Sequence, residues 1–308
     1  MKFFVTGGSG FIGSAVVDEL VSHGHQVVGL ARSDESAAKL EKAGAEVIKG
    51  GLEDLDALKK GARESDGILH LGFIHDFTKF AHSCKVDEAA IDTFISELEG
   101  TNKPFIYTAG LAGLQHKGDS SASETDVPVV DTSSDFGLRT ANELKALKSH
   151  SKGIRSMVMR LPPTVHGAGD QGFVTQLINI ADKKKVSYYI GEGQNIWPAI
   201  HRRDAAVLYR LAAEKGVAGA AYHAVHENLE TKKIAGAIGK ILDVPVESIE
   251  PAKATEALGF FGIVFALNVR VSNEKTLNEL GPWAPKEIAL LDDIQKNYKV
   301  SDAQYMKF

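Results

Sequence analysis

Short apolar runs alternate with amphipathic segments through the first half of the chain. Runs such as "KFFVTG" and "QVVGLAR" are apolar along most of their length, which is typical of strands buried on both faces of a sheet. The same pattern predicts further strands at "AEVIKG", "DGILHLG", "KPFIYTAG" and "IRSMVMRLP". Apolar residues at helical spacing predict helices over residues 11–23, 35–43, 55–62, 86–98 and 138–149. Strands joined by helices form a parallel sheet with helices on both faces, so we predict an α/β fold with a doubly wound sheet.

The pattern changes after Pro162 and Pro163. Loops become longer and richer in Gly and His, as in "TVHGAGDQG", and "AYHAV" is predicted as an isolated strand. Helices are expected over residues 204–214, 231–242 and 273–280, with Asp204 as an N-cap. We predict a first domain over residues 1–160 and a smaller C-terminal α/β lobe over residues 161–308, with a segment near residues 195–215 returning to the first domain.

Charge and composition narrow the class of protein. The 35 Lys and Arg residues and 40 Asp and Glu residues give a net charge of −5, and both signs are scattered along the chain. Such a surface offers no basic face to nucleic acid or anionic lipid. The apolar run at residues 257–269 is too short and too interrupted by glycine to span a membrane. Cys84 is the single cysteine, which excludes an internal disulfide and is compatible with a reducing compartment, so we expect a soluble, cytoplasmic protein.

A glycine-rich segment follows the first predicted strand. The letters "TGGSGFIG" begin at Thr6 and lead directly into a predicted helix. Gly7 would permit a tight turn, Gly10 would let the backbone approach a pyrophosphate, and Gly13 would let the helix pack against the strand. Amides at the start of the helix would then bind the phosphates, so the segment predicts a dinucleotide site. The further expected cofactor contacts are Ser9, Phe11, Ile12, Leu52, Leu71, Gly72 and Pro162.

The end of the second predicted strand indicates which dinucleotide is bound. An acidic residue at this point usually holds the ribose hydroxyls of NAD, but the sequence here reads "LARS". Ala31 stands where the acid is expected, and Arg32 and Ser33 would give a 2′-phosphate a positive charge and a hydroxyl. We therefore favour NADP over NAD. Arg32 could also stack on the adenine and accept either cofactor.

Four segments together carry a family resemblance over nearly the whole chain. The TGxxGxxG pattern, "RLPPTVHGAGD", "WPAIHRRDAA" and "SNEKTLNELGPWAP" resemble the extended short-chain dehydrogenases/reductases, the NAD-dependent epimerase/dehydratase superfamily. The chain looks most like an atypical subgroup related to carbonyl and aldehyde reductases. The resemblance implies a Rossmann-type nucleotide domain with a substrate lobe, a nicotinamide cofactor and a small-molecule carbonyl substrate.

The resemblance breaks at the catalytic motif. The family uses a Tyr as acid and a Lys four residues later, but "DTSSDFGLRTANE" contains neither. Alignment on "ANEL" puts Asp135 at the Tyr position and Arg139 at the Lys position, and a shift of one residue gives Phe136 and Thr140 instead. Arg139 would hold the nicotinamide ribose as a fixed positive charge. Asp135 would then be its ion-pair partner, because that pairing lowers the pKa of the carboxyl and makes it a poor proton donor.

The hydroxyl and the proton donor must then come from other residues. Gly110 stands where the family has its main hydroxyl, and Thr108 lies on the same face of the strand. His75 follows the fourth predicted strand, and the ordinary pKa range of a histidine suits a general acid, with Asp76 as its orienting group. Thr108 and His75 could equally be structural.

Aromatic residues of the second lobe favour an apolar substrate over a sugar nucleotide. Substrate contacts are expected from Asp76, His166 and Trp197, and no metal site is expected.

Three functions follow from this sequence. The first is an NADP-dependent reductase of small aldehydes or ketones, with Thr108 or water on the carbonyl oxygen and His75 or water as proton donor. The second is an NADP-binding sensor without catalysis, and the third is a nucleotide-sugar epimerase or dehydratase. The resemblance implies a monomer or a homodimer formed by the helices over residues 86–98 and 138–149.

Overall fold

A parallel sheet of seven strands forms the larger part of the molecule. The computed structural model describes residues 1–114, 120–131 and 135–300 of the 308-residue chain. The strand order is β10-β6-β5-β4-β1-β2-β3, and all neighbours are parallel. The strands are β1 (Lys2–Thr6), β2 (Gln26–Ala31), β3 (Glu46–Lys49), β4 (Gly67–His70), β5 (Pro104–Gly110), β6 (Arg155–Leu161) and β10 (Ala221–His223). The predicted doubly wound α/β fold is confirmed.

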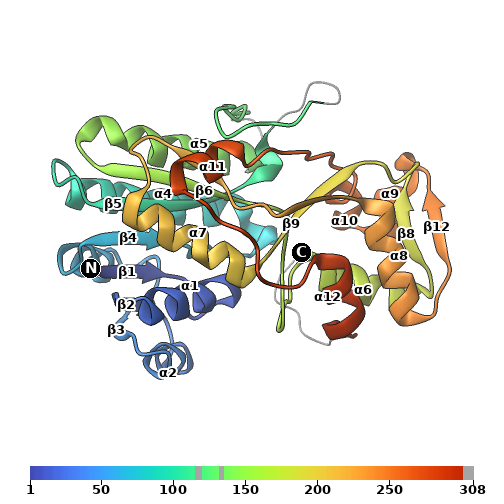
Figure 1. Cartoon of the computed structure of the whole chain (residues 1–308), viewed down its shortest axis with the longest axis horizontal. Helices are drawn as coiled ribbons and strands as arrows, with labels where there is room; N and C mark the ends of the chain where they lie inside the picture. The colour runs from blue at the N-terminus through green and yellow to red at the C-terminus, as the bar shows by residue number, and fades with distance from the viewer. Residues whose placement is uncertain (115–119, 132–134, 301–308) are drawn as a thin grey trace.

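Helices cover both faces of this sheet, because alternate residues of the buried strands send apolar side chains to opposite sides. One face is covered by α1 (Phe11–Ser22), α2 (Asp34–Lys42) and α7 (Arg202–Lys215). The other face is covered by α3 (Leu55–Arg63), α4 (Phe80–Leu98) and α5 (Asp135–Lys148). Figure 1 shows α1 and α7 side by side in front of the sheet. The α4 helix begins six residues before the predicted start at residue 86, at Phe80.

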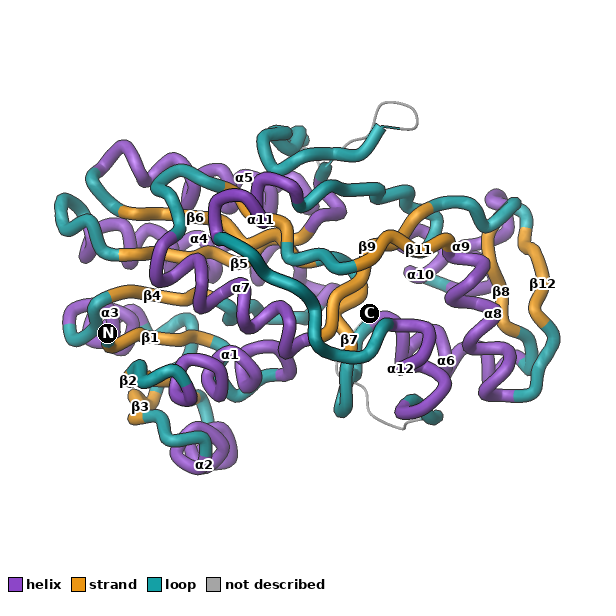
Figure 2. Tube along the Cα trace, viewed as in Figure 1, coloured by secondary structure: helices purple, strands orange, loops and turns teal. Residues whose placement is uncertain are grey.

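The second lobe lies beyond the carboxyl ends of the main strands (Figure 2). Its core is apolar and is centred on Trp197 and Phe265. Its helices are α6 (Phe173–Lys184), α8 (Thr231–Leu242), α9 (Ala254–Leu258), α10 (Phe260–Val264) and α12 (Leu290–Asn297). Its strands are β7 (Thr164–His166), β8 (Ser187–Ile190), β9 (Ile196–His201), β11 (Glu227–Glu230) and β12 (Val246–Ile249). Short 3-10 turns lie at η1 (Phe77–Lys79), η2 (Leu111–Gly113), η3 (Ser149–Lys152) and η4 (Pro251–Lys253).

Three segments from the second half of the chain pack on the first domain. The segment "AYHAV" does not form an isolated strand as predicted, because its residues 221–223 are β10 at the edge of the main sheet. α11 (Glu274–Leu280) covers that edge, where Thr276 accepts a hydrogen bond from the His223 amide. α7 is the third segment, and it packs along α1.

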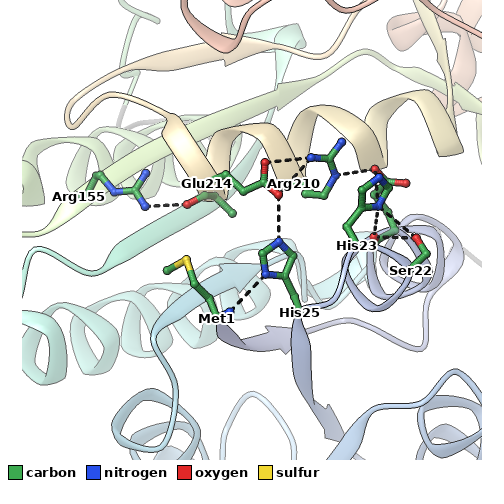
Figure 3. A network of polar contacts seen from close by, with 9 residues as sticks. Met1, Ser22, His23, His25, Arg155, Arg210 and Glu214 are labelled. Atoms are coloured by element: carbon green, nitrogen blue, oxygen red, sulfur yellow. Dashed lines mark hydrogen bonds and ion pairs between the residues drawn. The ribbon is translucent and has the colours of Figure 1, made fainter.

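Polar contacts fix α7 to the start of the sheet (Figure 3). The His25 ring, just before β2, lies 3.5 Å from the Met1 amino group through Nδ1 and 3.0 Å from Glu214 through Nε2. Arg210 contacts Glu214 at 2.9 Å and Glu19 of α1 at 2.7 Å. The C-terminal half of α7 is therefore tied to α1 and to the residue just before β2.

Asp204 does not cap α7. The N-cap is His201, whose ring accepts from the Arg203 amide, and Asp204 is buried in the first turn. Its carboxylate instead accepts from the amides of Lys286 and Glu287 at 2.9 and 3.2 Å. The residue joins the segment before α12 to α7. Within the described part of the chain, no helix combines the length and the apolar character needed to cross a membrane.

Candidate active site

The glycine turn between β1 and α1 forms one side of the site. Gly7 has a φ of 70°, and a Cβ there would lie 2.8 Å from the Gly72 nitrogen. A Cβ on Gly13 would lie 2.0 Å from the Gly7 carbonyl oxygen, so the helix can approach the strand only without a side chain. Gly10 is the N-cap of α1 and supplies no capping side chain. The amides at this helix start are therefore suited to an anionic ligand, and the turn fits a dinucleotide pyrophosphate.

Neighbouring loops close around this turn. The Gly72 amide, after β4, donates to the Thr6 hydroxyl at 3.0 Å, which joins β4 to β1. Leu52 packs against the same point, since its side chain lies 3.1 Å from where a Gly72 Cβ would be. Arg202 at the start of α7 donates to the Phe11 carbonyl at 3.1 Å, and its guanidinium lies 5.0 Å from the Phe11 ring centroid. The sequence argument missed Arg202, for which the adjacent arginines in "HRRD" are the only signal.

The end of β2 carries the residues from which the cofactor preference was predicted. Ala31 is buried, and Arg32 is exposed. Ser33 is the N-cap of α2, and its hydroxyl accepts from the Ser36 amide at 3.2 Å. Arg32 therefore lies beside a helix start, where both the side chain and the amides favour negative charge.

Arg139 is a second residue expected at the cofactor, and it lies on α5. One guanidinium nitrogen, NH1, is 2.7 Å from an Asp87 oxygen, and the other, NH2, donates to the Thr108 carbonyl at 2.8 Å. The group also lies 4.0 Å from the Phe73 ring centroid. The Arg139 side chain is 21% exposed, so part of it still faces outward. Asp87 is thus a buried partner of Arg139 that the sequence did not predict. The predicted pairing with Asp135 stays a prediction, because the Asp135 side chain, like residues 132–134 of the same motif, lies outside the described residues.

Asp87 itself is almost fully buried on α4. Tyr107 and Asn142 donate to one of its oxygens at 2.7 and 2.8 Å. Burial alone would raise the pKa of Asp87, but Arg139 and the hydrogen-bond donors hold it well below its usual range. Burial raises the pKa of Tyr107, so its hydroxyl keeps its proton, which it donates to Asp87 in a hydrogen bond. The sequence argument missed Asp87, although a carboxylate four residues before Ile91 on the apolar face of a helix is a usable signal.

The hydroxyl of Thr108 points toward α7. Its Oγ1 lies 2.7 Å from the hydroxyl of Tyr209, which is fully buried. Burial raises the pKa of Tyr209. Gly110, at the end of β5, is exposed, and a Cβ there would meet no atom of residues 1–114, 120–131 or 135–300 within 4 Å. The position where the resemblance expects a hydroxyl therefore carries none. The Thr108 hydroxyl is engaged with Tyr209 of α7 instead.

His75 lies in a cluster of aromatic rings after β4. Its ring is 5.4 Å from Phe73, and Phe77 stacks on Phe80 at 5.5 Å and contacts Phe260 of the second lobe at 5.3 Å. Burial, with Arg139 nearby, lowers the pKa of His75 to about 4. The expectation of an ordinary pKa is therefore wrong, and His75 is neutral at physiological pH.

Asp76, expected to orient His75, accepts from the amide and hydroxyl of Thr78 and caps η1. This pair of contacts fixes the turn that carries His75. The carboxylate therefore has a structural task in the loop.

His75 gives a prediction for stability against pH. Because its pKa is lower in the folded chain, acidification protonates the unfolded state first, and stability falls as pH drops from about 6.5 toward 4. We expect His75→Gln to weaken this dependence when urea midpoints are compared at pH 7.5 and 5.0. The exposed His82→Gln is the control and should keep the wild-type slope. Equal slopes for all three proteins would contradict the burial of a neutral His75.

Two expected substrate contacts lie inside the second lobe instead. His166 is buried, and its Nδ1 is 2.7 Å from Asp293 of α12. Trp197 is fully buried with its ring 4.8 Å from Phe265. Both side chains are therefore buried within the second lobe, and their role as substrate contacts stays a prediction. Pro162 is buried at the end of β6.

The structure shows two further features relevant to ligands. A cleft of about 320 Å³ lies beside β10, between α5 and α11, and not at the glycine turn. Among residues 1–114, 120–131 and 135–300, no three His, Cys, Asp or Glu side chains gather in a way that could hold a metal ion.

The fold and the glycine turn define a dinucleotide-binding α/β protein. Residues 3–226 match the model of the NAD dependent epimerase/dehydratase family, and the chain belongs to this family, within the extended short-chain dehydrogenase/reductase superfamily. The chain is 47% identical over 304 residues to "Uncharacterized protein YLL056C" of Saccharomyces cerevisiae, covering 98% of this chain and 100% of that one.

Two further proteins are more distant. A 4-hydroxy-2-methyl-3-oxo-4-farnesyl-3,4-dihydroquinoline-1-oxide ketoreductase of Stigmatella aurantiaca is 28% identical, over 72% of this chain and 67% of that one. The dTDP-glucose 4,6-dehydratase DesIV of Streptomyces venezuelae, with NAD and TYD bound, shares the fold at a TM-score of 0.77, with 17% identity over 96% of this chain and 95% of that one. Family membership makes the chain an NAD(P)-dependent protein of the oxidoreductase and epimerase type.

Proposed function

We propose that this protein is an NADP(H)-dependent carbonyl reductase that acts on small apolar aldehydes or ketones. The observation that carries the proposal is the protonation state of the side chains around Arg139 and Thr108. Arg139 is a permanent cation, and the pKa values of Tyr107 and Tyr209 are raised by burial. None of these three groups can remove a proton at neutral pH. Epimerisation and dehydration need such a base, whereas an alkoxide formed by reduction takes its proton from water.

Each residue has a proposed task in this reaction. The bound nicotinamide supplies the hydride. The glycine turn with Gly7, Gly10 and Gly13 receives the pyrophosphate, and the outward part of Arg139 hydrogen-bonds the nicotinamide ribose. The open space beside Gly110 admits the carbonyl oxygen together with a water that protonates it. Thr108 forms the wall of this space through its backbone, because its hydroxyl is engaged with Tyr209.

The aromatic cluster supports an apolar substrate. Phe73, Phe77 and Phe80 come from the loop and helix after β4, and Phe260 meets Phe77 from the second lobe. A sugar diphosphate would be bound by Lys or Arg side chains where the loop after β4 meets the second lobe. A flat or aliphatic carbonyl compound packs against aromatic rings instead. The ketoreductase relative, whose name contains a farnesyl group, is consistent with an apolar ketone.

Arg32 gives a prediction for the cofactor. We expect Arg32→Ala to weaken NADPH binding about 10- to 100-fold, because an arginine hydrogen bond to a phosphate is lost, and to leave NADH binding nearly unchanged. Fluorescence titration with both cofactors measures the ratio. Equal losses for NADPH and NADH would show that Arg32 contacts the adenine, which both cofactors share.

The function is tested by NADPH oxidation with a panel of aliphatic and aromatic aldehydes and ketones, followed at 340 nm as in any nicotinamide assay. The proposal expects turnover on carbonyl compounds and none on nucleotide sugars. Tight NADPH binding without oxidation by any carbonyl would favour a sensor, for which the engaged Thr108 and the missing acid are the supporting observations.

A further inference from the structure

Asp87 sits directly beneath Arg139 and contacts three elements of the fold. Its side chain is 1% exposed. Tyr107 and Asn142 donate hydrogen bonds to one carboxylate oxygen, Oδ2, at 2.7 and 2.8 Å. NH1 of Arg139 lies 2.7 Å from the same oxygen. The other oxygen, Oδ1, lies 3.2 Å from Nε2 of His70 on β4. Since four side chains surround it, the carboxylate has one position and cannot swing toward solvent.

On its other side, His70 contacts Thr6 at the start of the glycine turn. The Thr6 hydroxyl accepts from the Gly72 amide and lies 2.6 Å from His70 Nδ1. The Thr6 hydroxyl can donate to Nδ1 while it accepts from the amide, and in that tautomer the His70 proton lies on Nε2, facing Asp87. The Thr6 and His70 side chains therefore connect the end of β1 to the surroundings of Asp87, where His70 Nε2 lies 3.2 Å from Oδ1.

The contact on the other side determines where the guanidinium points. NH1 of Arg139 goes to Asp87 and NH2 goes to the Thr108 carbonyl, so two nitrogens of a planar group are fixed. A planar group held at two points has no remaining freedom of direction. The outward part of Arg139 is consequently aimed by Asp87.

We propose that Asp87 is a positioning residue of the cofactor site, which orients Arg139 so that the exposed part of its side chain meets the nicotinamide ribose. The proposal rests on the ribose-binding role given to Arg139 in the proposed function. It also accounts for arginine at this place, because a lysine ammonium is a point donor that a carboxylate beneath it would draw inward and away from the ribose.

The test separates the two ends of the cofactor. Asp87→Asn keeps the size of the side chain and removes its charge, so Arg139 loses its fixed direction. We expect the affinity for NADPH to fall about 10- to 100-fold, the loss of one charge-assisted hydrogen bond. The affinity for adenosine 2′,5′-bisphosphate, which lacks the nicotinamide ribose, should stay at the wild-type value. Isothermal titration calorimetry measures both ligands.

A double variant shows whether Asp87 acts through Arg139. We expect Arg139→Met to give the same loss of NADPH affinity, and Asp87→Asn in that background to add nothing further. The matched control is Glu143→Gln, which breaks another buried ion pair on α5 and should leave both affinities unchanged. If Asp87→Asn fails to fold, Tyr107→Phe removes one donor from Asp87 at nearly constant volume and should weaken NADPH alone, about twofold or more.

Several results would overturn the proposal. Wild-type NADPH affinity in Asp87→Asn, or equal loss of both ligands in a folded Asp87→Asn, would each do so. Additive losses of NADPH affinity in the double variant would show that Asp87 acts independently of Arg139. Unchanged NADPH affinity in Arg139→Met would show that Arg139 does not bind the nicotinamide ribose. The proposed reductase activity is tested separately, by carbonyl turnover of the wild-type protein.

Discussion

Gly13→Ala is expected to abolish measurable NADPH binding, with an affinity loss of more than about 100-fold. A Cβ at Gly13 would lie 2.0 Å from the Gly7 carbonyl oxygen and 2.9 Å from the Gly8 Cα, both of them backbone atoms that cannot turn aside. The start of α1 must therefore move away from β1. The amides that face the pyrophosphate move with it, and anion binding at a helix start depends on their direction. Fluorescence titration with NADPH measures the loss.

The control is a glycine in the second lobe. Gly236 lies inside α8, and a Cβ there would meet no atom within 4 Å. Gly236→Ala should keep wild-type NADPH affinity and stabilise the helix by about 0.5–1 kcal/mol. Wild-type affinity in Gly13→Ala would show that the glycine turn is not the pyrophosphate site.

Arg160→Met is expected to destabilise the fold by about 3–5 kcal/mol, the range for removing one partner of a buried ion pair. Arg160 on β6 and Glu143 on α5 are 2.7 Å apart, with side chains only 2% and 5% exposed. Removing the arginine leaves a carboxylate buried without its counter-charge. Burial already raises the pKa of Glu143 although Arg160 opposes this, so the variant raises it further. In the folded variant the Glu143 carboxyl then holds a proton that it releases in the unfolded state. The stability loss therefore grows as the pH rises from about 5 to about 8.

Urea denaturation at both pH values measures this effect. The surface pair of Arg63 and Glu97 is the control, because it has similar distances of 2.7 and 2.9 Å but an arginine side chain that is 66% exposed. Arg63→Met should cost at most about 1 kcal/mol at either pH. A loss in Arg160→Met no larger than this would mean that water reaches Glu143.

Local patterns were sufficient to predict the main sheet and the glycine turn. Continuous apolar runs mark strands buried on both faces, and strand before helix around Gly7 to Gly13 is a signal contained in one short segment. The edge strand β10 was misjudged, because whether a short apolar run joins a sheet depends on partners such as β6 that are far away in sequence. The predicted start of α4 was late for a similar reason, since "FAHSC" gains its helical contacts from the aromatic cluster.

The chemistry of the site depended on contacts that spacing does not show. Asp87 is separated from Arg139 by 52 positions in sequence, as their numbers give, and only the packing of α4 on α5 brings them together. His75 has the right residue type and the right loop, but burial changes its pKa. Trp197 was predicted as a substrate contact, because an aromatic side chain of the second lobe fits either a binding wall or a core. In the structure its ring packs in the core of that lobe.

Transfer of deuterium from the cofactor tests the central claim most directly. The wild-type protein would be incubated with an aromatic aldehyde and NADPH deuterated on either face of nicotinamide C4, and the alcohol would be analysed by mass spectrometry. A carbonyl reductase gives an alcohol with one deuterium on the former carbonyl carbon from one of the two labelled cofactors, and Gly13→Ala gives none. Bound NADPH with no deuterium in the alcohol from any carbonyl compound would contradict the proposed function.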